Sequence, residues 1–199
     1  EQLLIKIRFI IGATTLGTII GGLLTPSFIR MFSEMIVVFE QVRTLPRTAL
    51  AMLSPAKLFK LMKCFSNPFN RRVLHYLGLI RNLPWEFLVF QVLVTAFYTV
   101  GVLSTIYAAA LSPDIRATAV NLSGIVNGIA TMLLFILVDP TAALITDQCI
   151  NGLRKVEDAK AMNLYLVLAR LAGTLLAQFI VVLTALWVLW AAHFVNRVF

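Results

Sequence analysis

Charged residues are the scarcest class in this chain, and their scarcity restricts the fold. Asp, Glu, Lys and Arg make up 13% of the 199 residues, whereas 60% are hydrophobic, and the mean hydropathy is +0.90. Soluble globular proteins carry about 25% charged residues. So few polar side chains could not shield so many apolar ones from water. The composition therefore excludes an ordinary soluble domain and predicts a protein that lies in lipid.

The motifs of several enzyme classes are also missing. The chain contains no GxxxxGK[ST] phosphate loop, no HExxH zinc motif and no GxSxG hydrolase motif. Its two cysteines, Cys64 and Cys149, lie far apart without a CxxC spacing, so we interpret them as ordinary free thiols. We therefore expect no metal ion and no other cofactor.

An initiator methionine and a signal peptide are absent as well. The chain begins with Glu1 and becomes apolar at Leu3, with no short apolar core followed by a small-residue cleavage site. We therefore expect residues 1–199 to form a single membrane domain that is the C-terminal part of a longer chain.

Long apolar runs are abundant. A spanning helix needs roughly 20 mostly apolar residues, and the runs that reach this length are 9–29, 85–111, 117–146 and 161–194. Segment 30–84 instead mixes basic and bulky apolar residues at helical spacing, which is typical of helices that lie in the headgroup plane. The sequence predicts an all-α polytopic membrane protein with about four transmembrane helices, one of them broken, plus amphipathic interfacial helices.

Small residues and one proline distinguish the predicted spans. Gly17 with Gly21, and Gly124 with Gly128, form GxxxG pairs that let a second helix approach closely. For the first pair we favour packing within the same protein over dimerisation. In the third span the Asp139–Pro140 dipeptide is a helix-restart signal, because Pro lacks a backbone donor and Asp is a good N-cap. We expect two helical pieces that meet near Asp139.

Basic residues outnumber acidic ones, and the formal net charge is +8. They concentrate in segment 30–84 and in the turn 147–160, which the positive-inside rule places in the cytoplasm. We expect these segments to attract anionic membrane lipids, and we expect no nucleic acid because no binding motif accompanies the charge. Guanidinium groups suit phosphate oxygens, so the candidates for contact with a headgroup or a pyrophosphate are Arg71, Arg72, Arg81 and Arg116, although ordinary attraction to anionic lipid explains them equally well.

Ionisable residues inside apolar spans are rare and costly, and they mark candidate functional sites. Asp139 lies eight positions before Asp147, and Arg170 lies ten positions after Lys160. At 1.5 Å per residue these positions are about 12 Å and about 15 Å from the same membrane side. We hypothesise that Asp139 and Arg170 form an ion pair or share a polar cavity, with a purely structural pair as the alternative. Further candidates for a substrate path are Asn121, Ser123, Asn127 and Gln178, although polar residues at such positions also hold helices together.

The run from Asn121 to Asp147, NLSGIVNGIATMLLFILVDPTAALITD, resembles the Amj family, the alternate lipid II flippases of bacterial cell-wall synthesis. The preceding stretch 105–118 is also similar to that family. The resemblance implies a multi-pass protein of the bacterial cytoplasmic membrane whose partner is lipid II, a polyprenyl-pyrophosphate-linked disaccharide-pentapeptide. It implies transport rather than catalysis, and it supplies no residue-level mechanism.

Two other functions stay open at this point. One is an intramembrane enzyme acting on polyprenyl-phosphate lipids, although no nucleophile or pair of acids stands near the basic surface. The other is a non-catalytic membrane scaffold whose glycines and basic helices assemble partners. A homo-oligomer is compatible with each of these functions.

Overall fold

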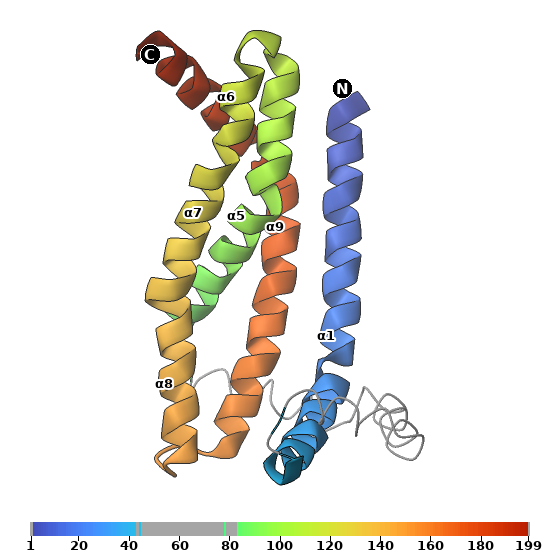
Figure 1. The fold of residues 1–199 in the computed structure, drawn as a ribbon, viewed down its shortest axis with the longest axis vertical. Helices are drawn as coiled ribbons and strands as arrows, with labels where there is room; N and C mark the ends of the chain where they lie inside the picture. The colour runs from blue at the N-terminus through green and yellow to red at the C-terminus, as the bar shows by residue number, and fades with distance from the viewer. Residues whose placement is uncertain (1, 43, 45–77, 79–82, 199) are drawn as a thin grey trace. The chain divides into compact units, whose positions relative to one another are not determined.

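The computed structural model describes residues 2–42, 44, 78 and 83–198, and every regular element in these ranges is helical. Four helical stretches are long and apolar enough to cross a membrane: Gln2–Phe28, Trp85–Leu111, Pro113–Ile150 and Val156–Arg197. The predicted all-α class with four spans is therefore confirmed (Figure 1). The elements, in chain order, are α1 (Gln2–Val42), α5 (Trp85–Leu111), η2 (Pro113–Ile115), α6 (Arg116–Asn121), α7 (Ser123–Leu133), η3 (Leu134–Val138), α8 (Asp139–Ile150) and α9 (Val156–Val198).

The chain divides into two compact units. The first contains residues 1–18 and 74–199, and the second contains residues 19–73. In the second unit α1 continues through Pro26 to Val42, beyond the expected end of the first span at residue 29. Most of segment 30–84, in which amphipathic interfacial helices are expected, lies outside the described residues.

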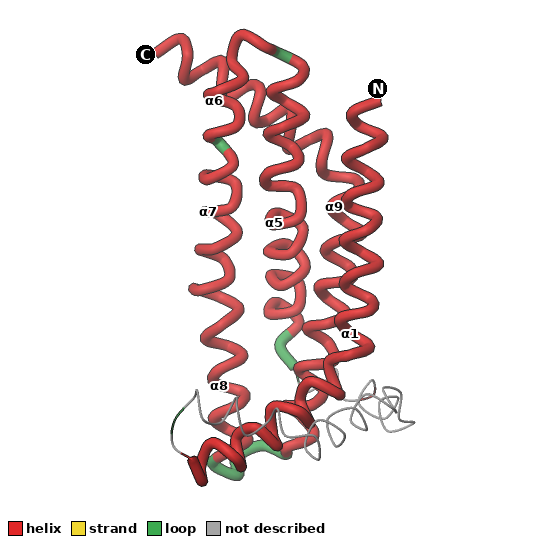
Figure 2. The backbone as a smooth tube through the Cα atoms, turned by 45° about the vertical axis from the view of Figure 1, so that its right-hand side comes forward, coloured by secondary structure: helices red, strands yellow, loops and turns green. Residues whose placement is uncertain are grey.

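The first unit is built around a parallel pair of long helices, α5 and α9, as Figure 2 shows. The faces that meet carry small side chains, which let the two backbones approach closely in the absence of a hydrophobic driving force between helices in lipid. A Cβ atom at Gly173 would lie 2.6 Å from Thr95 Cβ and 2.7 Å from the Val92 carbonyl oxygen. Only glycine fits at this position. Buried residues of the two faces include Ala96, Val100, Ser104 and Ala108 on α5 and Thr174, Ala177, Val181 and Ala185 on α9.

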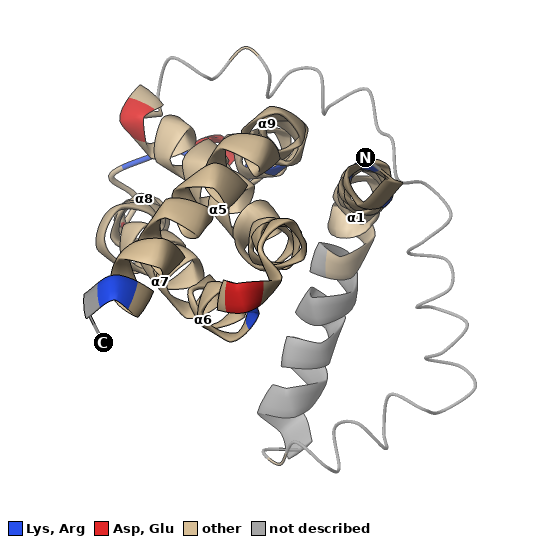
Figure 3. Cartoon of the chain, turned by 90° about the horizontal axis from the view of Figure 1, so that it is seen from above, with Lys and Arg blue, Asp and Glu red and all other residues tan. Residues whose placement is uncertain are grey.

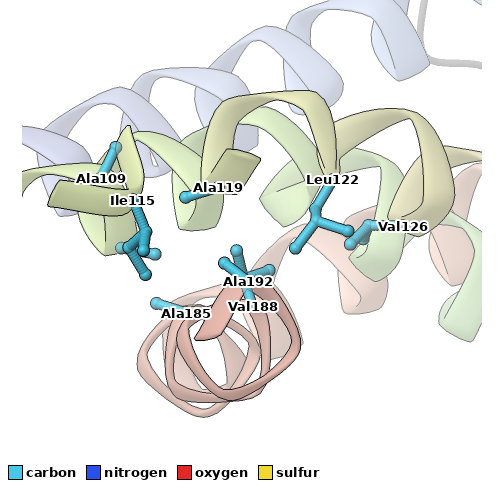
Figure 4. Packing of buried hydrophobic residues seen from close by; sticks show 9 residues of the cluster. Ala109, Ile115, Ala119, Leu122, Val126, Ala185, Val188 and Ala192 are labelled. Atoms are coloured by element: carbon cyan, nitrogen blue, oxygen red, sulfur yellow. The ribbon is translucent and has the colours of Figure 1, made fainter. Parts of the chain in front are cut away.

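Near the C-terminal ends of α5 and α9, the short helix α6 completes the packing. Ile115 and Ala119 lie against Ala185, Val188 and Ala192 of α9 in one buried cluster (Figure 4). Alanines again occupy the positions where the helices come closest. This cluster fixes the start of the third span on the α5–α9 pair.

The third span is divided into several helical segments. It consists of α6, α7, the π-helical segment η3 and α8, which run antiparallel to α5 (Figure 1). The expected interruption takes the form of η3, in which the Asp139 amide bonds the Leu134 carbonyl five residues earlier. The missing amide of Pro140 accounts for this change in register, because the ordinary pattern of hydrogen bonds cannot continue through proline.

Hydroxyl groups in the spans bond the helix that carries them. Thr95, Thr99 and Thr131 donate to carbonyl oxygens four residues earlier, at 2.9, 2.7 and 2.8 Å. Lipid offers no partner for a free donor, so this local bonding allows small polar side chains in an apolar interface. Figure 3 shows how little of the described helical surface carries charge.

Candidate functional site

Asp139 and Arg170 are both exposed, at the start of α8 and within α9. Their neighbours are buried: Val138 lies in the same cluster as Tyr165, and Ala169 is 7% exposed. Neither charged side chain has an ion-pair or hydrogen-bond partner in the described part of the chain. The structure therefore does not form the hypothesised direct pair, and each group remains open to another partner.

The π-helical turn before Asp139 leaves one backbone acceptor without its usual donor. The Asp139 amide bonds Leu134, so the next amide in the same register would belong to residue 140, which is proline and has none. Within this described helix the missing Pro140 amide therefore leaves one backbone carbonyl, that of Phe135 or Ile136, without its donor. Phe135, Ile136 and Asp139 are exposed together. A carboxylate and an unsatisfied carbonyl thus stand on an otherwise apolar span, where polar groups are costly unless partnered.

The polar residues that the sequence offered as substrate-path candidates in the third span differ in exposure and contacts in the structure. Asn121 is exposed and Ser123 is half-buried. Asn127 is the member that reaches another helix: its side chain lies against Gly101 of α5, where a Cβ atom would collide with Asn127 Oδ1. That oxygen is buried and has no N–H or O–H partner among the described residues. A Gly101 Cα–H points at it instead, and such contacts contribute about 0.5–1 kcal/mol.

One turn further along α7, a second polar contact joins the same two helices. Tyr98 Oη and Thr131 Oγ1 are 2.7 Å apart, and Thr131 also donates to the Asn127 carbonyl. Tyr98, Thr131, Asn127 and Gly101 therefore form a single polar contact line between α5 and α7.

Gln178 has a different role from the other candidates. Its Nε2 atom donates to the Arg8 carbonyl oxygen at 3.1 Å, which connects α9 to α1. Gly12 lies beside this contact, and a Cβ atom at that position would be 3.8 Å from Gln178 Nε2, an ordinary van der Waals distance. The Gln178 amide is therefore engaged by the backbone of α1.

The basic candidates are less informative. Arg116 is exposed at the first position of α6. Arg71, Arg72 and Arg81 lie outside the described residues.

The glycines that matter for packing differ from those that the motif search selected. Gly17, Gly124 and Gly128 have no described atom within 4 Å of their Cβ positions. The preference for packing the first GxxxG pair within the same protein stays a prediction, because only part of the protein is described. Gly101 and Gly173 are the close-approach sites instead. The only sequence signal that could have found them is a single glycine inside a span. Glycine destabilises a helix, so its presence there suggests that close packing against a second helix offsets the loss.

Comparison with known proteins gives two matches. The family model described as Amj, Alternate to MurJ, matches residues 1–192. The protein "Lipid II flippase Amj" of Bacillus subtilis (strain 168) is 37% identical over 195 residues, covering 93% of this chain and 68% of that protein. No solved structure matches the chain.

Proposed function

The chain belongs to the Amj family, and on that premise we propose that it is a lipid II flippase, a transporter rather than an enzyme. The observation that carries the proposal is the extent of the similarity. It covers residues 1–192 in the family comparison and reaches 37% identity to a protein named for this activity.

The fold supports the proposal because a lipid flippase has to solve a particular problem. It must shelter a pyrophosphate and sugars while the polyprenyl tail stays in lipid. Irregular backbone at membrane depth is tolerated only beside protein or a watery path, and interrupted helices are common at transport sites. The η3 segment and Asp139 give this chain such an interruption.

We assign the polar residues of the third and fourth spans to the transport path. Asp139 and the unsatisfied carbonyl of Phe135 or Ile136 supply acceptors, Arg170 supplies a cation, and Asn127 with Gln178 fixes the neighbouring helices. Asn121 and Ser123 extend the same series toward α6. The cytoplasmic side carries Arg154, Lys155 and Lys160 in and beside the α8–α9 turn, in agreement with the positive-inside rule.

The proposed setting is the cytoplasmic membrane of a bacterium, where lipid II must cross from the inner to the outer leaflet. Basic residues on the inner side would raise the local concentration of the anionic substrate and of anionic lipids. Arg71, Arg72 and Arg81 stay candidates for this recruitment, whereas Arg116, at the other end of the third span from the α8–α9 turn, stays a candidate for contact with the headgroup on the outer side.

Complementation tests the function directly. The full-length parent is expressed in a bacterium depleted of its main lipid II flippase, beside Asp139→Asn and Arg170→Gln versions of equal membrane abundance. We expect the parent to restore growth and the two variants to fail. Asp147→Asn is the matched control, because Asp147 is also exposed on α8 but lies two turns nearer the polar turn. It should restore growth.

Failure of a well-expressed parent would contradict the flippase assignment. Rescue by both variants would leave the function standing and remove Asp139 and Arg170 from the path. Conversion of labelled lipid II by purified protein in detergent would instead indicate an enzyme.

A further inference from the structure

We propose that the Arg8 side chain on α1 is a binding site, near the middle of the bilayer, for the pyrophosphate of the lipid-linked substrate in transit. The proposal rests on the function proposed above for the identity of the substrate. It adds a charged residue of α1 that directly precedes the first apolar run, 9–29.

The depth of Arg8 follows from the contacts that α1 makes. Gln178 bonds the Arg8 carbonyl, and Ile7 and Ile11 pack in one buried cluster with Val100 of α5 and with α9. Val100 lies two positions from the centre of the 27-residue α5, and Gln178 lies near the centre of the Val156–Arg197 span. The positions of these contacts on α5 and on α9 therefore both place Arg8 close to the middle of the bilayer.

The apolar run of α1 alone would give a different depth. It starts at Phe9, which would place Arg8 at the membrane boundary. We give the contacts more weight, because a hydrogen bond and a packed cluster fix the register of α1 against its neighbours. An apolar run fixes only its own length.

A guanidinium at this level cannot reach water along the helix. The hydrocarbon core is about 30 Å thick, so the middle lies about 15 Å from either boundary, whereas an arginine side chain extends roughly 6 Å. The Arg8 side chain is exposed, and it forms no ion pair with any carboxylate in the described residues. A cation at such depth needs a partner or a watery cavity.

The chemistry of arginine and the depth together select the ligand. A planar guanidinium binds phosphate oxygens through two parallel hydrogen bonds. Ordinary phospholipids keep their phosphates at the membrane surface, so they do not supply a partner at the middle level. A pyrophosphate-linked lipid that is crossing the membrane does supply one.

The surroundings of Arg8 hold its backbone without using its side chain. Gln178 Nε2 donates a hydrogen bond to the Arg8 carbonyl oxygen at 3.1 Å. Ile7 is 2% exposed and Ile11 is 0% exposed, so apolar packing anchors the same turns. A substitution at Arg8 therefore removes the guanidinium and leaves the attachment of α1 intact.

Equilibrium binding to the purified full-length protein in detergent tests the site. The probe is a fluorescent polyprenyl-pyrophosphate-linked disaccharide-pentapeptide, with phosphatidylglycerol as the competing surface phosphate. Arg8→Gln should weaken binding of the probe at least tenfold, and Arg8→Lys should weaken it less, because it keeps the charge but loses the paired hydrogen bonds. Excess phosphatidylglycerol should displace little of the probe.

Lys6→Gln is the matched control. Lys6 is exposed, carries the same charge and lies about 3 Å from the level of Arg8, but it is on the opposite flank of Ile7. It should change binding by less than threefold. An equal loss in Lys6→Gln and Arg8→Gln would overturn the assignment to Arg8 in favour of general charge, and so would full displacement by phosphatidylglycerol.

Growth rescue then separates this proposal from the function on which it rests. If the parent rescues growth while Arg8→Gln binds the probe normally and also rescues, the site is wrong and the flippase function stands. If the parent does not rescue growth, the function fails, and the binding result still decides the site. Weaker binding by Arg8→Gln supports a pyrophosphate contact, and unchanged binding rejects it.

Discussion

The α5–α9 interface and the contact between α1 and α9 are built in opposite ways. The α5–α9 interface is a long seam of small side chains with Gly173 at its tightest point. The N-terminal part of α1 instead meets the bundle through a small cluster around Ile7 and Ile11 and through one side-chain amide, that of Gln178. Past this cluster, Leu16 in the same unit is 63% exposed.

The difference separates a scaffold from an element that can move. Close backbone contact along a whole helix leaves few alternative arrangements, because packed interfaces respond to strain in discrete steps. A helix that is attached by one cluster and one hydrogen bond can shift at a much smaller cost. The residues that we assign to the pyrophosphate and to the path lie on α1, on the interrupted third span and on parts of α9 outside the small-residue seam, and the buried residues of the α5–α9 seam carry no charge.

The largest expected effect comes from breaking the seam. Gly173→Leu places a side chain where Thr95 Cβ and the Val92 carbonyl already lie, and overpacking of this kind should cost about 3 kcal/mol or more. Thermal unfolding of the purified protein in detergent measures the loss. Gly128→Leu is the control, since no described atom lies within 4 Å of its Cβ position. Equal losses of stability in both variants would show that the α5–α9 interface at Gly173 is no more tightly packed than the surroundings of Gly128.

A smaller loss is expected where α5 meets α7. Gly101→Ala would collide with the Asn127 side chain, which can swing away at a cost of about 1–2 kcal/mol. The double variant Gly101→Ala with Asn127→Ala should recover part of that loss, because the second change removes the obstacle. Strictly additive losses in the unfolding measurement would reject the direct contact.

Removing the hydrogen bond between α9 and α1 should reduce the stability of the protein by a smaller amount still. Gln178→Leu removes the hydrogen bond to the Arg8 carbonyl, with a loss of about 1 kcal/mol. Spin labels at the exposed positions Thr14 and Leu183 should report a broader distance distribution between α1 and α9. Asn163→Leu is the matched control, because its amide bonds only its own helix, at Ala159. An unchanged distribution in Gln178→Leu would contradict a role for this amide in holding α1.

The smallest effect is expected at the hydroxyl pair. Thr131→Val removes the contact with Tyr98 as well as the bond to the Asn127 carbonyl, for a loss of about 0.6 kcal/mol. Thr146→Val loses only the equivalent bond within its own helix, to Ala142. The difference between the two unfolding measurements isolates the Tyr98 contact, and a difference of zero would show that it contributes nothing.

The sequence predicted the spans well because their signal is local. Apolar length alone identifies a spanning helix, and Pro140 carries its own reason for the interruption. The partners across helices could not be predicted in this way. Gly101 and Asn127 are 26 positions apart in the sequence, and Arg8 and Gln178 are 170 apart. Neither pair shares a motif, since only the packing of the helices brings them together. The hypothesised Asp139–Arg170 pair shows the opposite case: equal estimated depth does not make two side chains face each other.

The π-helical segment also has a rotational consequence. Each residue of an α-helix turns the chain by about 100°, and the longer hydrogen bond of η3 accommodates one residue more than a regular turn would hold. Deleting one residue from 134–138 would therefore restore a regular helix and leave α8 facing the same way relative to α7, with Ile145, which is 2% exposed, still in the core. Deleting one residue from the regular part of α7 would instead turn α8 by about 100° around its own axis and carry Ile145 out of the core. The η3 segment thus keeps the two halves of the third span in rotational register.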